Sequence, residues 1–201
     1  MVASLDTSQL TPGFDNAVLD AQSCFRAVLW ALSRPGMIQE VIAEAPAPAP
    51  LSAAAAALAL TLIDADAPVW LGKAVDTSPV RAFFRFHCGT SAVDVPEAAA
   101  FALCTPSDLD GFYSLNPGHE EYPERSATLV MMVDALEGGD PRLLRGPGVD
   151  GEFGIAPRGL PAWFDEAWAR NSSAYPLGVD LFLTAGNRLM GLPRSVEMRR
   201  V

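Results

Sequence analysis

The stretch that decides the fold runs from Tyr175 to Arg194 and reads YPLGVDLFLTAGNRLMGLPR. It contains two apolar runs, at 179–184 and 188–192, which are separated by Ala-Gly-Asn at positions 185–187. Gly and Asn tolerate the positive φ of a tight turn, so the stretch predicts an antiparallel hairpin. Phe182 interrupts the alternation of apolar and polar residues in the first run, which indicates a strand covered on both faces.

Asp180 lies within the first run, so it is an acid in a strand that we expect to be largely buried. A buried carboxylate needs an arginine, a backbone donor or a ligand as its partner. Arg194 stands just beyond the second run, where it would meet Asp180 across the sheet. We therefore predict a structural role for Asp180 and Arg194, unless a pocket opens beside them.

The composition is typical of a soluble globular protein. The chain has 201 residues, of which 50% are hydrophobic, and this is enough for one sizeable core. Its net charge is −10, from 14 basic and 24 acidic residues, which argues against binding to a nucleic-acid backbone. We expect a flexible N-terminal arm over residues 1–13 and a single α/β domain over residues 14–201.

Cysteine and histidine are too few and too scattered to predict a metal centre. The three cysteines are odd in number and lack the spacing of a zinc site, and the chain has two histidines. Residues 1–15 have no features of a signal peptide, and the apolar segment 51–63 is too short to span a membrane. We therefore expect a reduced, cytoplasmic protein without a bound metal or a membrane anchor.

The first clear helix is expected to begin at Asp20, as its N-cap, and to end before Pro35. Its apolar residues at helical spacing, which we expect to face the core, are Ala21, Phe25, Val28, Leu29 and Leu32.

The remaining pattern predicts alternating helices and strands. Further helices are expected at 52–63, 78–88 (capped by Ser78), 105–115 and 161–171, and further strands at 37–42, 68–71, 98–104, 127–133, 142–145 and 153–156. Helices and strands alternate early and strands cluster late, which favours a three-layer α/β fold with a mixed sheet flanked by helices. Trp30, Trp163 and Trp168 fall on helices and are expected to be core or interface anchors.

Several well-specified active sites are excluded by their missing motifs. The sequence contains no phosphate-binding loop, no dinucleotide-binding glycine motif after a strand, no HExxH, no CxxC and no GxSxG. Lys73 is the sole lysine, so a Schiff base with pyridoxal phosphate would depend on that residue alone. The sequence therefore predicts no self-contained catalytic site.

Arg85 and His87 lie near the end of the helix expected to stop at Gly89. Arg85 could bind an anion, and His87 could transfer a proton or donate to a phosphoryl oxygen. The alternative, which residue type alone favours, is that a histidine at this position caps carbonyl groups at the helix end. The pair is a candidate ligand-binding site.

Two loops carry the other candidate ligand-binding residues. Asp64 and Asp66 could hold a magnesium ion or a ribose hydroxyl, although acids in a turn between a helix and a strand more often serve the turn itself. Arg142 and Arg145 flank the loop Gly146-Pro147-Gly148, whose backbone could approach an anionic ligand closely. Glycines equally make ordinary turns, so both interpretations of this loop stay open.

Six sequence blocks occur in order over nearly the whole chain. They are Asp20-Ala-Gln22 with Phe25-Arg26; Ser33-Arg-Pro-Gly36; Thr61-Leu-Ile-Asp64 through Asp66-Ala-Pro-Val-Trp-Leu71; Arg85-Phe-His87; Gly146-Pro-Gly148; and Pro176-Leu-Gly-Val-Asp180-Leu through Pro193-Arg194. Together these blocks resemble the PhnH family, a subunit of the carbon–phosphorus lyase complex for phosphonate utilisation. The resemblance is poorest before Phe14 and in the loop 116–126.

The resemblance implies a fold related to the large domain of pyridoxal-phosphate-dependent transferases, without the cofactor or its lysine. It also implies a homodimer in isolation and assembly with PhnG, PhnI and PhnJ subunits. That core complex is expected to displace adenine from ATP with an alkylphosphonate such as methylphosphonate, giving ribose 1-phosphonate 5-triphosphate. The family pattern carries no catalytic residue for this subunit.

Two main functions remain open from the sequence, beside a weaker third, a stand-alone enzyme that would show nucleosidase activity in the isolated chain. In the first, the chain is an essential, non-catalytic subunit that shapes the complex, and no cofactor is expected. In the second, it contributes a phosphonate- or nucleotide-binding catalytic surface built from Arg85 and His87 with the loop 145–148.

Overall fold

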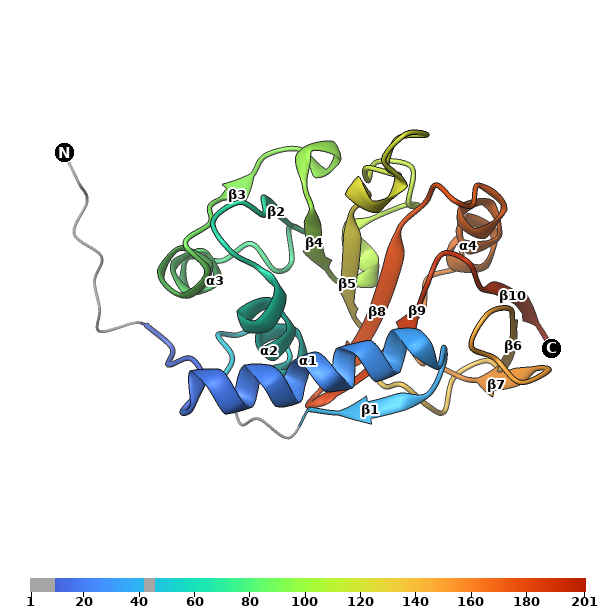
Figure 1. Cartoon of the computed structure of the whole chain (residues 1–201), viewed down its shortest axis with the longest axis horizontal. Coiled ribbons are helices and arrows are strands. Elements are labelled where there is room, and N and C mark those ends of the chain that lie inside the picture. The colour runs from blue at the N-terminus through green and yellow to red at the C-terminus, as the bar shows by residue number, and fades with distance from the viewer. Residues whose placement is uncertain (1–9, 42–45) are drawn as a thin grey trace.

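The computed structural model of the chain describes residues 10–41 and 46–201. Residues 1–9 of the arm expected over 1–13, and Ile42 at the end of the strand expected over 37–42, lie outside the described residues. Figure 1 shows helices on both sides of a central sheet whose middle strands run roughly vertically in that view.

The hairpin predicted from the sequence forms at the centre of the fold. Strands β8 (Asp180–Ala185) and β9 (Arg188–Leu192) pair antiparallel, with Leu183 opposite Met190. Gly186 has a φ of 60°, but no non-glycine residue in the described chain has a positive φ, so Asn187 does not adopt one. A positive φ at the first central residue alone is the pattern of a type II′ hairpin turn.

The hairpin belongs to a seven-stranded mixed sheet with the order β1-β9-β8-β5-β4-β2-β3. The other strands are β1 (Ile38–Glu40), β2 (Val69–Leu71), β3 (Ala92–Val93), β4 (Phe101–Cys104) and β5 (Thr128–Met132). Neighbouring strands from β8 to β3 are parallel, whereas β9 pairs antiparallel with both β8 and β1. The predicted mixed sheet is confirmed.

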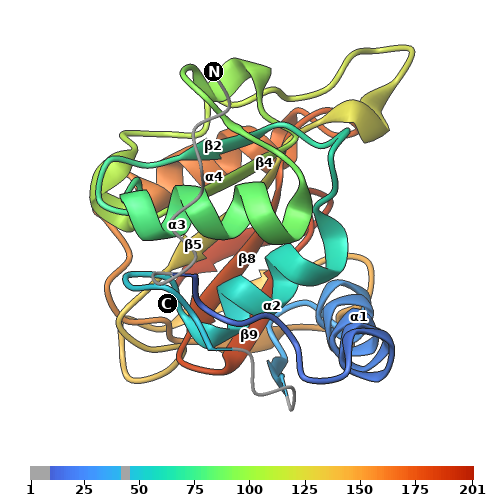
Figure 2. The ribbon, with the colours of Figure 1, turned by 90° about the vertical axis from the view of Figure 1, so that its left-hand side faces the viewer.

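Helices cover both faces of this sheet. On one face lie α1 (Ala17–Ser33), α2 (Ala53–Leu62) and α3 (Ser78–Phe83), which continues as a π-helix over Phe84–Cys88; on the other face lies α4 (Phe164–Ser173). Figure 2 views the first group from its α3 end, with α4 behind the sheet.

Successive residues of the central strands enter two separate cores. Val130 and Phe182 pack in the core with α1, α2 and α3, whereas Leu129 and Leu181 pack in the core with Trp168 of α4. Adjacent side chains of a strand point to opposite faces, so these strands are apolar throughout because both faces are buried. The three-layer arrangement predicted from the sequence is thereby confirmed.

A second, three-stranded antiparallel sheet lies beside α4. It has the order β10-β6-β7 and is formed by β6 (Arg142–Arg145), β7 (Phe153–Ile155) and β10 (Glu197–Arg200). The indole of Trp168 donates to the carbonyl of Val196, at 2.9 Å, and so joins α4 to the start of β10. Strand β10 was not predicted, because its mostly charged sequence lacks an alternating apolar pattern.

Helix α1 differs from the prediction in both its start and its buried face. Its N-cap is Asn16, whose side chain accepts from the Leu19 amide, while Asp20 accepts from the Asn16 amide at 2.9 Å. This reciprocal arrangement satisfies two amides and starts the helix one turn earlier than expected. Phe25 and Leu29, which were expected to face the core, are exposed.

Two other helices also differ from expectation. Thr77, not Ser78, caps α3 through its side chain. The helix expected at 105–115 is only a single 3-10 turn, Pro106–Asp108, because the Asp108 carboxylate caps the Thr105 amide at 2.8 Å and the chain then becomes extended at Leu109. Further 3-10 turns are Pro96–Ala98 and Pro123–Arg125.

Candidate functional site

Asp180 and Arg194 form the ion pair predicted from the sequence. Arg194 donates to Asp180 Oδ1 from its backbone amide at 2.8 Å and from Nε at 3.1 Å, and Nη2 lies 2.6 Å from Oδ2. The Arg194 side chain is 13% exposed and the Asp180 side chain is 24% exposed. Both carboxylate oxygens are therefore paired, and the bidentate geometry holds the end of β9 against the start of β8.

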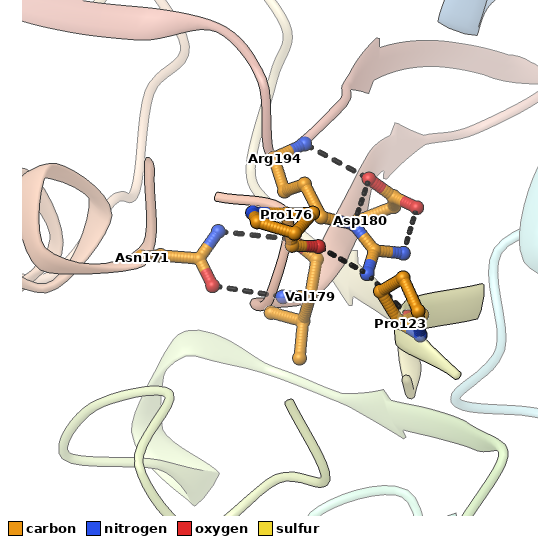
Figure 3. A network of polar contacts seen from close by, with 6 residues as sticks. All are labelled: Pro123, Asn171, Pro176, Val179, Asp180 and Arg194. Carbon is orange, nitrogen blue, oxygen red and sulfur yellow. Dashed lines mark hydrogen bonds and ion pairs between the residues drawn. The ribbon is translucent and has the colours of Figure 1, made fainter. Parts of the chain in front are cut away.

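Neighbouring segments are attached to the same ion pair (Figure 3). Arg194 Nη1 donates to the carbonyl of Pro123 at 2.9 Å, which fixes the loop 116–126. Asn171 at the end of α4 exchanges two hydrogen bonds with the backbone of Val179, at 2.8 and 2.9 Å. The network therefore joins the loop 116–126 and the end of α4 to the two strands of the hairpin.

A groove of about 260 Å³ opens beside this network, between α4 and the chain that follows β4. Asn171 is one of the residues that line the groove, and aromatic side chains form its walls. The rings of Phe112 and Trp163 pack edge to face, with their centres 5.4 Å apart. The full lining is Asp110, Gly111, Phe112, Tyr113, Leu115, Pro117, Trp163, Glu166, Ala167, Arg170, Asn171, Ala174 and Gly178. Trp163 thus lines a surface groove, whereas Trp168 is a core residue.

The charged groups at the rim of the groove are already paired. Arg170 forms an ion pair with Glu166 one turn away on α4. A hydrogen bond from the Tyr113 hydroxyl to Asp110 raises the pKa of that phenol. Neither pairing supplies a nucleophile with an adjacent base, so the groove has the chemistry of a binding surface rather than of a catalytic site.

His87 contacts the segment that precedes α1. Its Nε2 lies 2.9 Å from the carbonyl oxygen of Thr11. The centre of its ring lies 4.8 Å from that of Phe83 and 4.9 Å from that of Phe86. A Cβ at Gly13 would approach the ring to 3.0 Å. His87 therefore holds residues 11–13 against the π-helix, while Arg85 is exposed.

Asp64 and Asp66 form a local turn. The amide of Asp66 donates to Asp64 Oδ1 at 3.0 Å, which is the hydrogen bond of an Asx turn. Asp64 also lies close enough to Cys88 to affect it: burial and, second, the Asp64 charge raise the pKa of that thiol to about 12. The turn therefore lies beside the end of the π-helix that carries Arg85 and His87.

The loop Gly146–Gly148 packs against the protein itself. Gly148 has a φ of 81°, and a Cβ there would lie 2.5 Å from the carbonyl oxygen of Ser33 at the end of α1. Gly146, with a φ of 142°, approaches the backbone of Ser195. Both glycines thus allow close backbone contact, the structural alternative that the sequence left open. Arg145 is exposed beside this loop.

The candidate residues fall at two separate places. His87 contacts the chain just before α1, whereas Gly148 contacts the last residue of α1, and a helix of 17 residues is about 25 Å long. The combination of Arg85 and His87 with the loop 145–148 in one small-ligand site, considered in the sequence analysis, is therefore wrong. Asp64 lies near Cys88, at the end of the π-helix that carries Arg85 and His87.

Sequence reasoning missed Asn171, Pro123 and the aromatic groove. Asn171 lies seven residues after Phe164 and three after Trp168, so it falls on the same buried face of α4. This spacing was the one feature of the sequence that could have identified it. Pro123 acts through its backbone carbonyl, so its side-chain type could not reveal the contact.

In residues 10–41 and 46–201, no three side chains of His, Cys, Asp or Glu gather as potential metal ligands. Over the same ranges, no helix combines the length and the apolar character needed to cross a membrane.

Comparisons with known proteins cover almost the whole chain. Residues 12–199 match the model of a family described as bacterial phosphonate metabolism protein (PhnH). The chain is 42% identical over 195 residues to the alpha-D-ribose 1-methylphosphonate 5-triphosphate synthase subunit PhnH of Rhizobium meliloti, covering 96% of this chain and 98% of that protein. It is 35% identical over 105 residues to a putative C-P lyase subunit protein, HtxG, of Stutzerimonas stutzeri, covering 51% and 52% of the two chains. This chain therefore belongs to the PhnH family of bacterial phosphonate metabolism proteins.

Proposed function

We infer that this chain is a non-catalytic but essential subunit of the complex that makes α-D-ribose 1-methylphosphonate 5-triphosphate. The observation that carries this proposal is the 42% identity to a protein of that name, extending over 98% of the relative. The similarity extends over 96% of this chain, so the surfaces that the relative uses in its complex are expected to have counterparts here.

The proposed reaction is that of the assembled complex. ATP and an alkylphosphonate such as methylphosphonate are converted to ribose 1-phosphonate 5-triphosphate, and adenine is released. The proposed partners are the PhnG, PhnI and PhnJ subunits of the carbon–phosphorus lyase core complex, and the chain alone is proposed to be a homodimer. We further propose a cytoplasmic location.

The placement of reactive groups supports a non-catalytic role for this subunit. Asp180 is fully paired with Arg194, and His87 contacts the Thr11 carbonyl. Burial raises the pKa of the Cys24, Cys88 and Cys104 thiols, so each thiol stays protonated and unreactive at neutral pH. The polar groups most suited to chemistry are thus engaged in holding the fold.

Two proposals about the fold accompany this function. Residues 14–201 are proposed to be one α/β domain preceded by an arm, and the domain is proposed to be related to the large domain of pyridoxal-phosphate-dependent transferases without their cofactor. The run of parallel strands from β8 to β3 supports this relation, and Lys73 lies exposed just after β2.

The function is tested in the intact organism and in the assembled complex. Deletion of the gene should abolish growth on methylphosphonate as sole phosphorus source, with growth on phosphate as the control. Co-expression with PhnG, PhnI and PhnJ should yield a complex that releases adenine from ATP and methylphosphonate. Normal growth of the deletion strain on methylphosphonate would contradict the proposal.

A second candidate function is a ligand-binding or catalytic surface around Arg85 and His87 for anionic phosphonate or nucleotide. The observation that favours it is that the exposed Arg85 forms no ion pair with any described residue. Arg85→Ala should then lower adenine release without altering assembly, and His87→Ala should do the same. Fully active, intact complexes containing both variants would rule this function out.

A further inference from the structure

A helix that packs on a sheet usually buries its large apolar side chains, whereas α1 buries small ones and exposes large ones. The buried residues are the small or medium-sized Cys24, Val28 and Ala31. The large apolar residues are between 45% and 77% exposed and comprise Val18, Leu19, Phe25, Leu29 and Trp30. Val18, Phe25 and Leu29 are separated by seven and four residues and therefore lie along one line of the helix. Leu19 and Trp30 each follow one of these residues directly, so the five lie on one side of the helix, defined here as the outer face of α1.

The inner side of α1 has no room for bulk. A Cβ at Gly191 of β9 would lie 2.6 Å from the carbonyl oxygen of Ala31, so the helix backbone lies almost directly on the strand. Figure 2 views α1 end-on at the margin of the molecule, with α2 toward the interior. The fold therefore makes no use of the large apolar residues on the outer face.

The exposed apolar area is too large for an ordinary solvent-facing helix. The five side chains present on the order of several hundred Å², the size at which an apolar patch usually marks an interaction site. The outer face of α1 thus has the composition of a surface covered by another protein.

The charges on this face identify the kind of partner. Arg26 stands among the apolar residues, and the Arg34 guanidinium lies 3.4 Å from the centre of the Trp30 ring. Asp20 is turned toward the N-cap, where it accepts from the Asn16 amide. On a chain of net charge −10, this face is therefore apolar with positive charge. Trp and Arg are also residue types enriched at binding hot spots.

A second copy of this chain does not complement that pattern. Two α1 helices packed antiparallel about a two-fold axis near Cys24 would place their Arg26 residues only about 6 Å apart along the helix axis. No acid of α1 lies on the outer face between them. Like charges at that separation disfavour self-association through this face.

We propose that the outer face of α1 docks against a different subunit of the complex, one that presents an apolar surface with a carboxylate opposite Arg26. This inference rests on the proposed function, because it identifies the surface through which the subunit binds its partners. Leu29 and Phe25 supply the apolar centre of the contact, and Arg26 supplies its charge complementarity.

The test uses the complex co-expressed with PhnG, PhnI and PhnJ, captured through a tag on PhnI. Leu29→Asp and Arg26→Glu should each lower the amount of this chain recovered by about tenfold or more, the loss typical of a hot-spot residue. Arg26→Lys should retain most binding. The matched control is Val95→Asp, because Val95 is 53% exposed but follows β3 at the opposite end of the sheet. Circular dichroism and melting temperature verify that each variant is folded.

Each outcome separates this inference from the proposed function. If Leu29→Asp and Arg26→Glu are both recovered in the same amount as the wild-type chain, the docking surface is overturned and the proposed function stands. Failure of the wild-type chain to be recovered overturns the proposed function and the inference with it. Conversion of an isolated wild-type dimer to monomer by Leu29→Asp would assign the face to a second copy and also overturn the inference.

Discussion

Arg142 and Asp165 form an ion pair that joins the small sheet to α4, with Nη2 3.1 Å from Oδ2 and the Arg142 side chain only 4% exposed. Arg142 also donates to the carbonyl of Asp140 at 2.9 Å. Arg145, three residues later on the same strand, is exposed. The two arginines that precede the glycine loop thus have different environments, although the sequence makes them look equivalent.

Arg142→Ala should lower the free energy of unfolding by about 2–4 kcal/mol, because it removes one partner of a buried pair. The remaining contact of Asp165 with Arg200 at 3.4 Å offsets part of the loss. Arg145→Ala is the matched control and should change stability by less than about 0.5 kcal/mol. Urea unfolding of both variants checks the prediction, and equal stabilities would contradict it.

Asp180→Ala should cost a similar amount, about 2–4 kcal/mol, because it leaves the Arg194 guanidinium without its carboxylate. Thermal melting of the isolated chain measures the effect. Glu166→Ala is the control: it breaks an ion pair whose side chains are 77% and 72% exposed, and such pairs contribute little. A variant that melts like wild type but inactivates the complex would show that Asp180 acts in function rather than in stability.

Gly191→Ala should destabilise the protein by about 1–3 kcal/mol, because the added Cβ would push α1 away from β9. Gly154→Ala serves as the control, since the nearest atom to its Cβ, on Leu143, would be 3.9 Å away. Denaturant unfolding compares the two. Equal effects would mean that α1 does not lie as close to the sheet as described.

Stability should decrease as the pH rises from about 9 toward 12, in part through Cys88. Burial raises the pKa of this thiol from 9.0 to about 12, so above pH 9 the unfolded chain loses a proton that the folded chain keeps. Cys88→Ala should flatten this alkaline decline, measured by urea unfolding at pH 8 and pH 10. Ser126→Ala, at another buried site, should keep the wild-type slope, and an unchanged slope in Cys88→Ala would contradict the prediction.

Local sequence signals predicted the structure correctly where the residues of a short segment are enough to determine its conformation. The hairpin 180–192 follows from two apolar runs around a glycine turn, and α2 follows from its alanine-rich sequence. These signals failed where contacts with a segment distant in the chain determine which residues are buried. Phe25 and Leu29 have the spacing of core residues, yet the close approach of Gly191 to Ala31 leaves that side of α1 to smaller residues.

By itself, the sequence determined the α/β class, the mixed sheet, the pairing of Asp180 with Arg194 and the resemblance to the PhnH family. Each depends on periodicity, turn residues or motifs that are readable over a few positions. Only the tertiary structure decided that Arg85 and His87 lie far from the loop 145–148, and that α1 leaves its largest apolar residues uncovered. These features depend on how closely distant backbone segments approach one another, and side-chain patterns along the chain do not encode that distance.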